Sequence, residues 1–342
     1  MRVVLQRTHP EPHLMKTTGT VITLIIALAV AGGCKKEESQ GYSPTPTTSD
    51  PVRAIITDAR MNATQIFTVN ASFGGVFVGS HGTVLTFAPH AFRDHQGGVV
   101  NGVVTIDLME VMSVSEMVRT NIRTVAIANG TKYMLESGGA VRLRATASGE
   151  QVTVAPGAAM VNFPANALDP AMLQYAGVED GNGDVLWQDP VALAADSAIF
   201  LPDSAGGWIT GNYYNAPWPA GNFGSSTWPP YDFINCDHPI PPGGDSTDVT
   251  INLPVGFANN TMVWVVLPAI NCMVYLEASS ATGIRAGFPV RVGLQGTIVA
   301  LSQQNGQYYS SFTPITIAMD HEQAITMQPT SLSQYQADLD GL

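Results

Sequence analysis

The chain has 342 residues, with 15 Lys and Arg against 27 Asp and Glu, so its formal net charge is −12. Charged residues make up only 12% of the chain and hydrophobic residues 45%, which excludes intrinsic disorder for most of it and predicts substantial buried cores. Nucleic-acid binding is not expected, because neutralising phosphates needs clustered Lys and Arg.

The first distinctive segment is an apolar run near the N-terminus, Val21–Ala31 (VITLIIALAVA). It is about half the roughly 20 residues that a membrane-spanning helix needs, which favours a signal-peptide core. The residues before Met15 do not suit a signal peptide, so we expect translation to start at Met15. Residues 1–33 are therefore predicted to be a signal peptide.

Small residues directly precede Cys34, and this arrangement resembles the lipobox of bacterial lipoproteins. The resemblance implies that Cys34 is lipidated, becomes the mature N-terminus and holds the protein to a membrane. The run Lys35–Glu38 (KKEE) resembles the tag that directs lipoproteins of Bacteroidota to the outer face of the outer membrane. A segment rich in Ser, Pro and Thr follows, so residues 34–52 are predicted to be the lipidated cysteine and a disordered tether.

The body of the chain is predicted to be all-β. Short β-branched or alternating runs are separated by turn formers such as Asn129-Gly130, Ser148-Gly149 and Asn305-Gly306. In Val141–Ala145 apolar residues alternate with two arginines, which is typical of a half-buried strand. One short helix is expected after Ser113, because Glu116 has the spacing of a capping box.

We predict two β-sandwich-like modules in tandem after the signal peptide and tether. The first covers residues 53–205 and the second residues 206–327, and residues 328–342 form a tail or short helix. Asp180–Asp184 (DGNGD) mimics the start of a calcium-binding loop, but the residues that follow lack the glutamate that completes such a loop. A hairpin turn is the preferred interpretation.

A resemblance to a known family covers most of residues 60–320, and two of the runs that carry it lie in the first module. They are GTVLTFAPHAFRDHQGGVVNGVVTIDLMEVMSVSEMVRTN (residues 82–121) and LESGGAVRLRATASGEQV (residues 135–152). Together they resemble uncharacterised surface lipoproteins of Bacteroidota whose first module is similar to a ZU5-type β-sandwich. Some ZU5 domains cleave themselves at a His-Phe-Ser site, which does not occur in this sequence. The resemblance implies a fold and a location but no activity.

Charge is distributed unevenly along the chain. Residues 145–284 contain no Lys or Arg but 13 Asp and Glu. We expect a solvated acidic surface that keeps the protein soluble and repels anionic surfaces. The alternative is that this surface recruits a cation or a basic partner.

Apart from Cys34, the cysteines are Cys236 and Cys272. Because an exported protein meets oxidising conditions, we predict a disulfide between them. Two buried, unpaired thiols are the alternative.

A cluster of aromatic residues lies between residues 208 and 233, with Pro and Gly between them and no cation nearby. Exposed aromatic rings next to amides can stack on sugar rings and bond their hydroxyls, so the segment is a candidate glycan-binding surface. The alternative is that the rings pack inward as a plug between the modules. The candidate ligand-binding residues are Trp208, Tyr213, Tyr214, Trp218, Trp228 and Tyr231.

Candidate catalytic and metal-binding motifs are weak. His81, His90 and His95 lie in a turn-rich segment, and Cys236-Asp237-His238 with Cys272 supplies too few zinc ligands. His321-Glu322 lacks the second histidine of a zinc protease, and no nucleophile elbow or phosphate-binding loop occurs in the sequence. We therefore predict no enzyme, no catalytic or metal-ligating residue and no cofactor.

The sequence as a whole predicts a non-enzymatic lipoprotein of the outer membrane and cell surface that acts as a binding or assembly scaffold. Its expected partners are the membrane and either a glycan or another surface protein. The alternatives are a glycan-binding module that captures polysaccharide and an exported enzyme with an unrecognised site. Three Asp-Ser-small triplets resemble the O-glycosylation sequon of Bacteroidota, which makes Ser197, Ser204 and Ser246 candidate modification sites.

Overall fold

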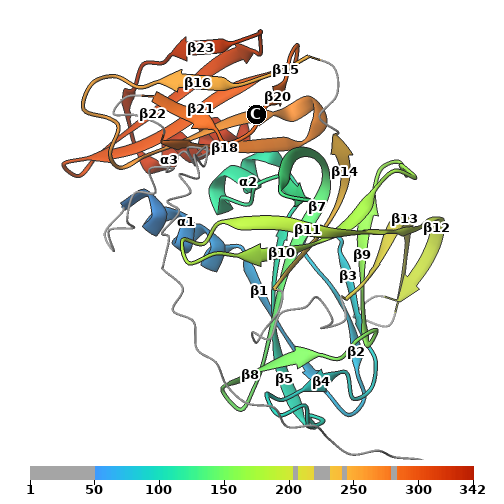
Figure 1. Cartoon of the computed structure of the whole chain (residues 1–342). Coiled ribbons are helices and arrows are strands. Elements are labelled where there is room, and N and C mark those ends of the chain that lie inside the picture. Colours follow the sequence, from blue (N-terminus) through green and yellow to red (C-terminus); the bar gives the residue numbers. More distant parts are fainter. Residues whose placement is uncertain (1–50, 203–206, 219–231, 241–244, 279–282) are drawn as a thin grey trace, which may run out of the picture. The chain divides into compact units, whose positions relative to one another are not determined.

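The computed structural model describes residues 51–202, 207–218, 232–240, 245–278 and 283–342 (Figure 1). Strands dominate these ranges, so the predicted all-β fold is confirmed. Cys34 and most of the predicted tether lie outside the described residues.

The first module consists of two sheets. The larger has nine strands. Along its main path these are β1 (Thr64–Asn70), β5 (Val103–Val111), β7 (Thr131–Ala147), β14 (Phe233–Ile240), β10 (Leu173–Glu179), β11 (Val185–Ala192) and β6 (Val125–Ala128), with β8 (Glu150–Val154) beside β7 and β4 (Phe92–Arg93) beside β8. The second sheet has the order β12 (Ala194–Pro202), β13 (Trp208–Pro217), β9 (Ala159–Ala165), β3 (Val84–Phe87) and β2 (Gly75–Val78).

A hydrophobic core fills the space between these two sheets. Alternation on β7 places Val141, Leu143 and Ala145 in this core, as the sequence predicts. Arg142 and Arg144 alternate with these residues on the same strand, and they make polar contacts outside this core. The module is therefore a sandwich whose larger sheet is covered on one face by the smaller one.

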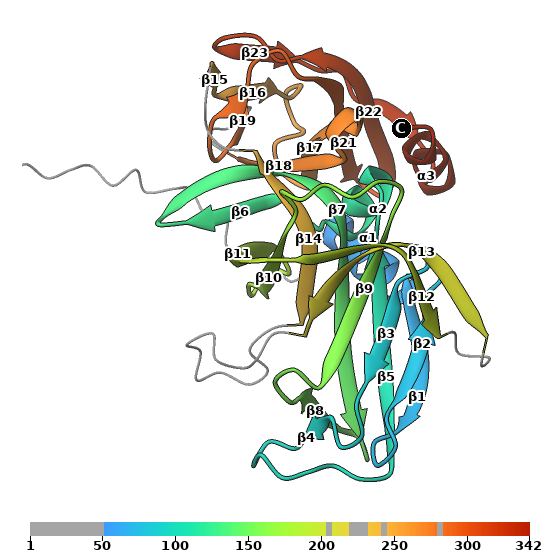
Figure 2. The same ribbon diagram turned by 90° about the vertical axis from the view of Figure 1, so that its right-hand side faces the viewer.

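The second module is built on an eight-stranded sheet. Its order is β23 (His321–Ala324), β16 (Val249–Asn252), β19 (Gly283–Ala286), β18 (Cys272–Ala278), β17 (Thr261–Leu267), β21 (Gln295–Gln304), β22 (Gln307–Thr316) and β24 (Gln328–Thr330). A small pair, β15 (Ser246–Thr247) with β20 (Val290–Arg291), stands beside it. Figure 2 shows that the sheet is curled. A second core packs on one face of it.

The boundary between the modules corrects our sequence assignment. We placed it at residue 206, but β13 and β14 follow that residue and belong to the two sheets of the first module. β14 pairs with both β7 and β10, near the middle of the larger sheet. The two sheet systems therefore divide between Ile240, where β14 ends, and Ser246, where β15 begins. Strand order in space does not follow strand order in sequence here, which local turn signals do not reveal.

Within the described ranges, three α-helices and one short 3₁₀ turn, η1 (Pro268–Ile270), interrupt the strands. Helix α2 (Val114–Thr120) begins with the predicted capping box, in which the Ser113 hydroxyl accepts from the Glu116 N–H. Helix α3 (Leu332–Asp340) confirms the short C-terminal helix. Helix α1 (Pro51–Asn62) was not predicted, and it begins inside the segment that we assigned to the tether. None of the described helices has the length and apolar character that crossing a bilayer requires.

The predicted two-residue turns are confirmed. Asn129-Gly130, Ser148-Gly149 and Asn305-Gly306 all have positive φ at both residues, as the tight hairpins between the flanking strands require. These turns join β6 to β7, β7 to β8 and β21 to β22.

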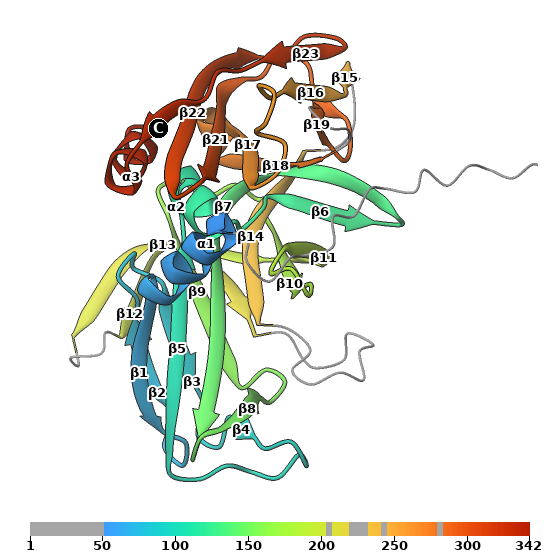
Figure 3. The same ribbon diagram turned by 90° about the vertical axis from the view of Figure 1, so that its left-hand side faces the viewer.

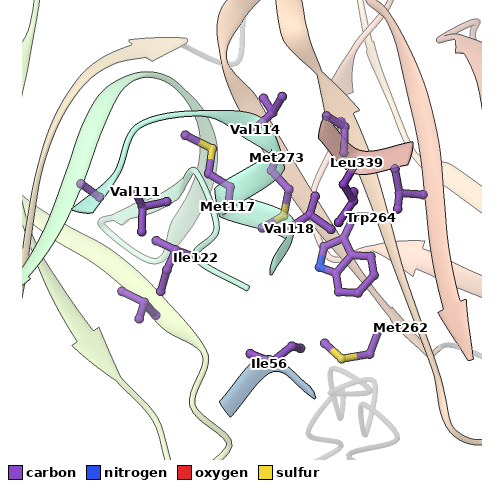
Figure 4. Packing of buried hydrophobic residues seen from close by; sticks show 14 of the residues in the cluster. Ile56, Val111, Val114, Met117, Val118, Ile122, Met262, Trp264, Met273 and Leu339 are labelled. Atoms are coloured by element: carbon purple, nitrogen blue, oxygen red, sulfur yellow. The ribbon is translucent and has the colours of Figure 1, made fainter. Parts of the chain in front are cut away.

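A third hydrophobic core lies where the two sheet systems meet (Figure 4). From the first module it takes residues of the larger sheet, and from the second it takes residues of β17, β18 and β21. All three helices contribute side chains, including Ile56 of α1, Met117 of α2 and Leu339 of α3. Figure 3 shows α1 and α2 between the two sheet systems. Both modules therefore share one continuous core.

Candidate functional site

Arg60, near the end of α1, is the centre of a polar network beside the shared core. Its Nε donates to the carbonyl of Thr120 at 2.6 Å, and its Nη1 donates to Oε1 of Glu179 at 2.5 Å. Its Nη2 donates to the carbonyl of Gly183 at 2.7 Å. The residue is only 8% exposed, so a single guanidinium holds α1, the end of α2 and the β10–β11 turn together.

The electrostatics of Arg60 follow from this burial. Desolvation lowers the pKa of the guanidinium, while the carboxylates of Glu179 and Asp184 oppose that shift. Glu179 also accepts from Arg144, whose Nη2 lies 3.2 Å from Oε2. The buried charge is therefore paired and hydrogen-bonded, as a buried cation requires.

The turn at Asp180–Asp184 is the predicted hairpin between β10 and β11. Oδ1 of Asp180 accepts from the N–H groups of Asn182 and Asp184 at 2.8 and 2.9 Å, so this carboxylate closes its own turn. Asp184 faces Arg123, with Nη2 and Oδ2 2.5 Å apart. The Asp184 carboxylate, which a calcium loop would use to bind the ion, is paired with Arg123 here.

Asn121 connects this turn to the second module. It caps α2 in the left-handed conformation, with φ of 49° and ψ of 43°. Its Nδ2 donates to Oδ1 of Asp184 at 2.7 Å, and its Oδ1 accepts from Nε1 of Trp264 on β17 at 2.9 Å. Arg123 adds a second link, since its guanidinium lies 4.4 Å from the ring centroid of Tyr275 on β18. We call the residues Arg60, Asn121, Arg123, Glu179, Asp184 and Trp264 the joint.

A second polar cluster surrounds the carboxylate of Glu110 on β5. It accepts from Nε2 of Gln65 at 2.8 Å and from the N–H groups of His81 and Thr83 at 3.0 and 3.1 Å. The Ser80 hydroxyl also donates to it at 3.3 Å. Burial by itself raises the pKa of this carboxyl, but the hydrogen bonds to its ionised form outweigh burial and lower the pKa.

This cluster contains a serine, a histidine and a carboxylate in contact. Oγ of Ser80 lies 3.3 Å from Nδ1 of His81, and Nε2 of His81 lies 2.8 Å from Oε1 of Glu116. A nucleophile would have to give its proton to the histidine, whereas the Ser80 hydroxyl donates to Glu110. The N–H groups of His81 and Thr83, which could stabilise an oxyanion, are occupied by the same carboxylate. The geometry suits fastening of the β2–β3 turn better than acyl transfer.

Asp237 on β14 is a fully buried carboxyl. It accepts from the Ser137 hydroxyl at 2.8 Å and from Nδ2 of Asn235 at 2.5 Å. Burial raises the pKa of Asp237 well above its ordinary value, and the hydrogen bonds from Ser137 and the Gly138 N–H counteract only part of that shift. A Cβ at Gly138 would lie 2.7 Å from the carbonyl oxygen of Cys236, so the close approach of β7 to β14 requires glycine there.

The predicted disulfide is wrong for this structure, because Cys236 and Cys272 are both free and buried. Cys236 points into the core of the first sandwich, whereas Cys272 belongs to the core of the second module and lies 3.1 Å from Oγ1 of Thr124. The prediction of a disulfide relied only on the oxidising compartment, and the positions of the two cysteines in separate cores rule that bond out. Burial raises the pKa of both thiols, to about 12 for Cys272.

The aromatic segment divides between the surface and the core. Tyr213, Tyr214 and Trp218 are at most 7% exposed, and the latter two pack in the core of the first sandwich. Trp208 is 68% exposed at the start of β13. Trp228 and Tyr231 lie outside the described residues. Among the four described residues only Trp208 is exposed, so these four do not form one solvent-facing platform.

The remaining candidate residues are scattered. His81 contacts Glu116, while His90 and His95 lie in exposed turns. Within the part of the chain that the structure describes, no three or more metal-ligating side chains gather around one point. Ser246 is half-buried on β15, the side chain of Ser197 is not described, and Ser204 lies outside the described ranges.

Sequence reasoning missed the joint and Asp237. One signal was available: Arg53, Arg60 and Arg123 precede a stretch with no cation, and in the structure they reach its acidic side chains. No protein-family model and no curated protein matches the chain.

Proposed function

We propose that this protein is a lipid-anchored protein of the outer membrane whose two modules form one rigid scaffold for binding or assembly, without catalytic activity. The observation that carries the proposal is the core shared by the two sheet systems. A hinge between modules needs an interface that can open at little cost. Opening this one would expose Trp264 and Met273 and break the hydrogen bond from Trp264 to Asn121.

The joint favours one relative placement of the elements that pack around this core. Arg60 and Asn121 bond to groups whose geometry is fixed by α2 and by the β10–β11 turn. Directional bonds of this kind select one relative placement of the packed elements, whereas apolar contact alone tolerates sliding. A fixed spacing between two surfaces is the property that an assembly scaffold needs.

Rigidity is testable by measuring a distance between the modules. Spin labels at Glu150→Cys on β8 and Val255→Cys, an exposed position after β16, are read by pulsed dipolar spectroscopy. The labelled chain is diluted with unlabelled chain, so that only distances within one molecule are measured. A single narrow distribution is expected, and a broad or bimodal one would contradict the rigid scaffold.

The proposed location at the membrane rests on the segment around Cys34. Its resemblance to a lipobox supports lipidation, and the Lys-Lys-Glu-Glu run supports export to the cell surface. A fatty-acid analogue is expected to label the wild-type chain and not Cys34→Ala. Protease added to intact cells is expected to digest the body of the protein, and complete protection would place it on the inner side of the membrane.

Glycan capture is a second candidate function, and the exposed ring of Trp208 favours it. A flat aromatic ring that is open to solvent can stack on the C–H face of a sugar. Trp208→Ala is expected to reduce retention on immobilised surface polysaccharide while leaving the unfolding midpoint unchanged. Equal retention of the variant and the wild type would remove this candidate.

A further inference from the structure

Three exposed apolar side chains lie at one end of the first sandwich. Phe73, in the turn between β1 and β2, is 76% exposed, and Val99 and Val103, just before and at the start of β5, are 49% and 66% exposed. The N–H of Ala71 donates to the carbonyl of Gly102 at 2.7 Å, which holds the two segments together. We call Phe73, Val99 and Val103 the apolar tip. Exposed apolar surface of this kind marks a site for contact with a protein or a membrane.

The turn that carries Phe73 is closed by its own hydrogen bonds. The carbonyl of Asn70 accepts from the N–H groups of Phe73 and Gly74, each at 3.0 Å. Oδ1 of Asn70 accepts from the Ser72 N–H at 3.0 Å, and the Ser72 hydroxyl donates to Oδ1 of Asn101 at 3.3 Å. The backbone donors of this turn therefore need no partner from outside.

The turn before Val99 is closed in the same way. Oδ1 of Asp94 accepts from the N–H groups of Gln96 and Gly98 at 2.9 and 2.8 Å, and its carbonyl accepts from the Gly97 N–H at 3.0 Å. Turns whose donors are bonded can enter an apolar medium without the cost of those groups being left unpaired. The same donors are unavailable to a partner strand, in contrast to those of an open sheet edge. Lipid is therefore favoured over an extended peptide as the occupant.

Charge also distinguishes this end of the sandwich from the rest of the molecule. Residues 61–92 contain no Asp, Glu, Lys or Arg, whereas the chain as a whole has a net charge of −12. Before Val99, Arg93 and Asp94 have opposite signs, and Glu150, exposed on β8, adds one acidic group. This end therefore meets less repulsion from lipid headgroups than the acidic remainder of the chain does.

We infer that the apolar tip docks into the interfacial layer of the bilayer that holds the chain. This inference rests on the proposed lipid anchor at Cys34. Residues 35–50 join Cys34 to Pro51 and span at most about 60 Å when fully extended, so the bilayer always lies near the body. An aromatic ring and two branched side chains on closed turns gain from leaving water there. Docking fixes the orientation of the scaffold relative to the membrane.

The same geometry identifies an exposed apolar residue that stays in water. Ile66 is 70% exposed, but it pairs with Asp107 on β5, so a carboxylate lies beside it on the same face. Ile66 is also four residues from Asn70 along β1, about 13 Å from the turn. It is a matched control for Phe73, with similar exposure but outside the apolar tip.

The test measures the depth of a nitroxide in vesicles of phosphatidylethanolamine and phosphatidylcholine that hold the lipidated full chain. The label is attached at Val99→Cys, and at Val255→Cys for comparison, because Val255 is 92% exposed in the second module. Oxygen concentrates in lipid and a nickel chelate stays in water. Relative to the label at position 255, the label at position 99 is expected to collide more with oxygen and less with nickel.

Substitution of the ring tests what holds the tip in the bilayer. Phe73→Ser is expected to lower the ratio of docked to undocked chains by about tenfold or more, since burying one phenylalanine side chain contributes a factor of that size. Ile66→Ser should leave the ratio unchanged. Equal effects of the two substitutions would overturn the inference.

Flotation of the vesicles separates failure of the anchor from failure of docking. A chain that floats with the vesicles, but whose label at position 99 is as open to nickel as the label at 255, would overturn the docking and leave the anchor intact. A label protected from both reagents would show contact with protein and also overturn the docking. A chain that does not float would overturn the anchor and the docking with it.

Discussion

Arg60 and Glu179 lie 119 residues apart in the chain, and their side chains meet with Nη1 and Oε1 2.5 Å apart. This contact is one of several that resolve the uneven charge of the sequence. Arg123 reaches Asp184, and Arg144 reaches Asp232. The acidic stretch is therefore partly neutralised by arginines from earlier in the chain, and its surface is less acidic than the sequence predicts.

Removing Arg60 should destabilise the folded region that contains both modules. Arg60→Ala removes the donor of Oε1 of Glu179 and of the carbonyls of Thr120 and Gly183, while Arg144 still donates to Oε2 of Glu179. We expect the free energy of unfolding to fall by about 3–5 kcal/mol, as for other broken buried ion pairs. Urea denaturation followed by tryptophan fluorescence measures the change.

The control is Arg285→Ala, since Arg285 pairs with Asp248 where both side chains are about half exposed. Its cost should stay within about 1 kcal/mol. Equal losses in the two variants would show that the joint is no more important than a surface ion pair.

Asn121 combines two roles that separate substitutions can distinguish. Asn121→Gly keeps the left-handed backbone but removes the bonds to Asp184 and Trp264, and we expect a loss of about 2–3 kcal/mol. Asn121→Ala removes the same bonds and adds the strain of positive φ, about 1 kcal/mol more. If the glycine variant is as stable as the wild type, the side-chain bonds contribute nothing to stability.

Asp237 should make stability depend on pH. Because burial raises its pKa in the folded protein, the native state holds this proton more tightly than the unfolded chain. The contribution of Asp237 to the free energy of unfolding therefore falls as pH rises above the ordinary value of 3.8 toward its raised pKa, by at most about 1.4 kcal/mol per pH unit. Asp237→Asn lacks this pH dependence, so the free energy of unfolding of the variant should increase relative to that of the wild type as pH increases.

Denaturation at a series of pH values checks this expectation. Asp58→Asn is the control, because it removes a carboxyl that is exposed on α1 and not buried. Parallel pH profiles for the wild type and Asp237→Asn would contradict the prediction.

The two buried thiols should be unreactive in the folded protein. Cys236 and Cys272 are fully buried, and their raised pKa values keep them protonated. A chain with Cys34→Ala should show no reaction with a thiol reagent when native and two reactive thiols when unfolded. Reducing agent should not shift its unfolding midpoint, and a shift would indicate a disulfide.

The sequence by itself determined the local features of the fold. Hairpin turns such as Asn129-Gly130 depend on residues that adopt positive φ, and the α2 cap depends on Ser113 and Glu116 three residues apart. The alternation along β7 depends only on the period of a strand. Each of these signals spans a few residues, so each can be read without knowing what lies nearby in space.

Only the tertiary structure decided which distant segments meet. β14 pairs between β7 and β10, so the first module extends beyond the boundary that the sequence predicts. The same pairing places Cys236 in the core of the first sandwich, whereas Cys272 lies in the core of the second module. Helix α1 gains its stability from packing Val52 and Ile56 into the shared core, a contact that its own sequence does not encode. The joint likewise depends on an ion pair, Arg60 with Glu179, and a hydrogen bond, Trp264 to Asn121, between residues more than 100 positions apart, because burial and pairing are properties of the packed chain.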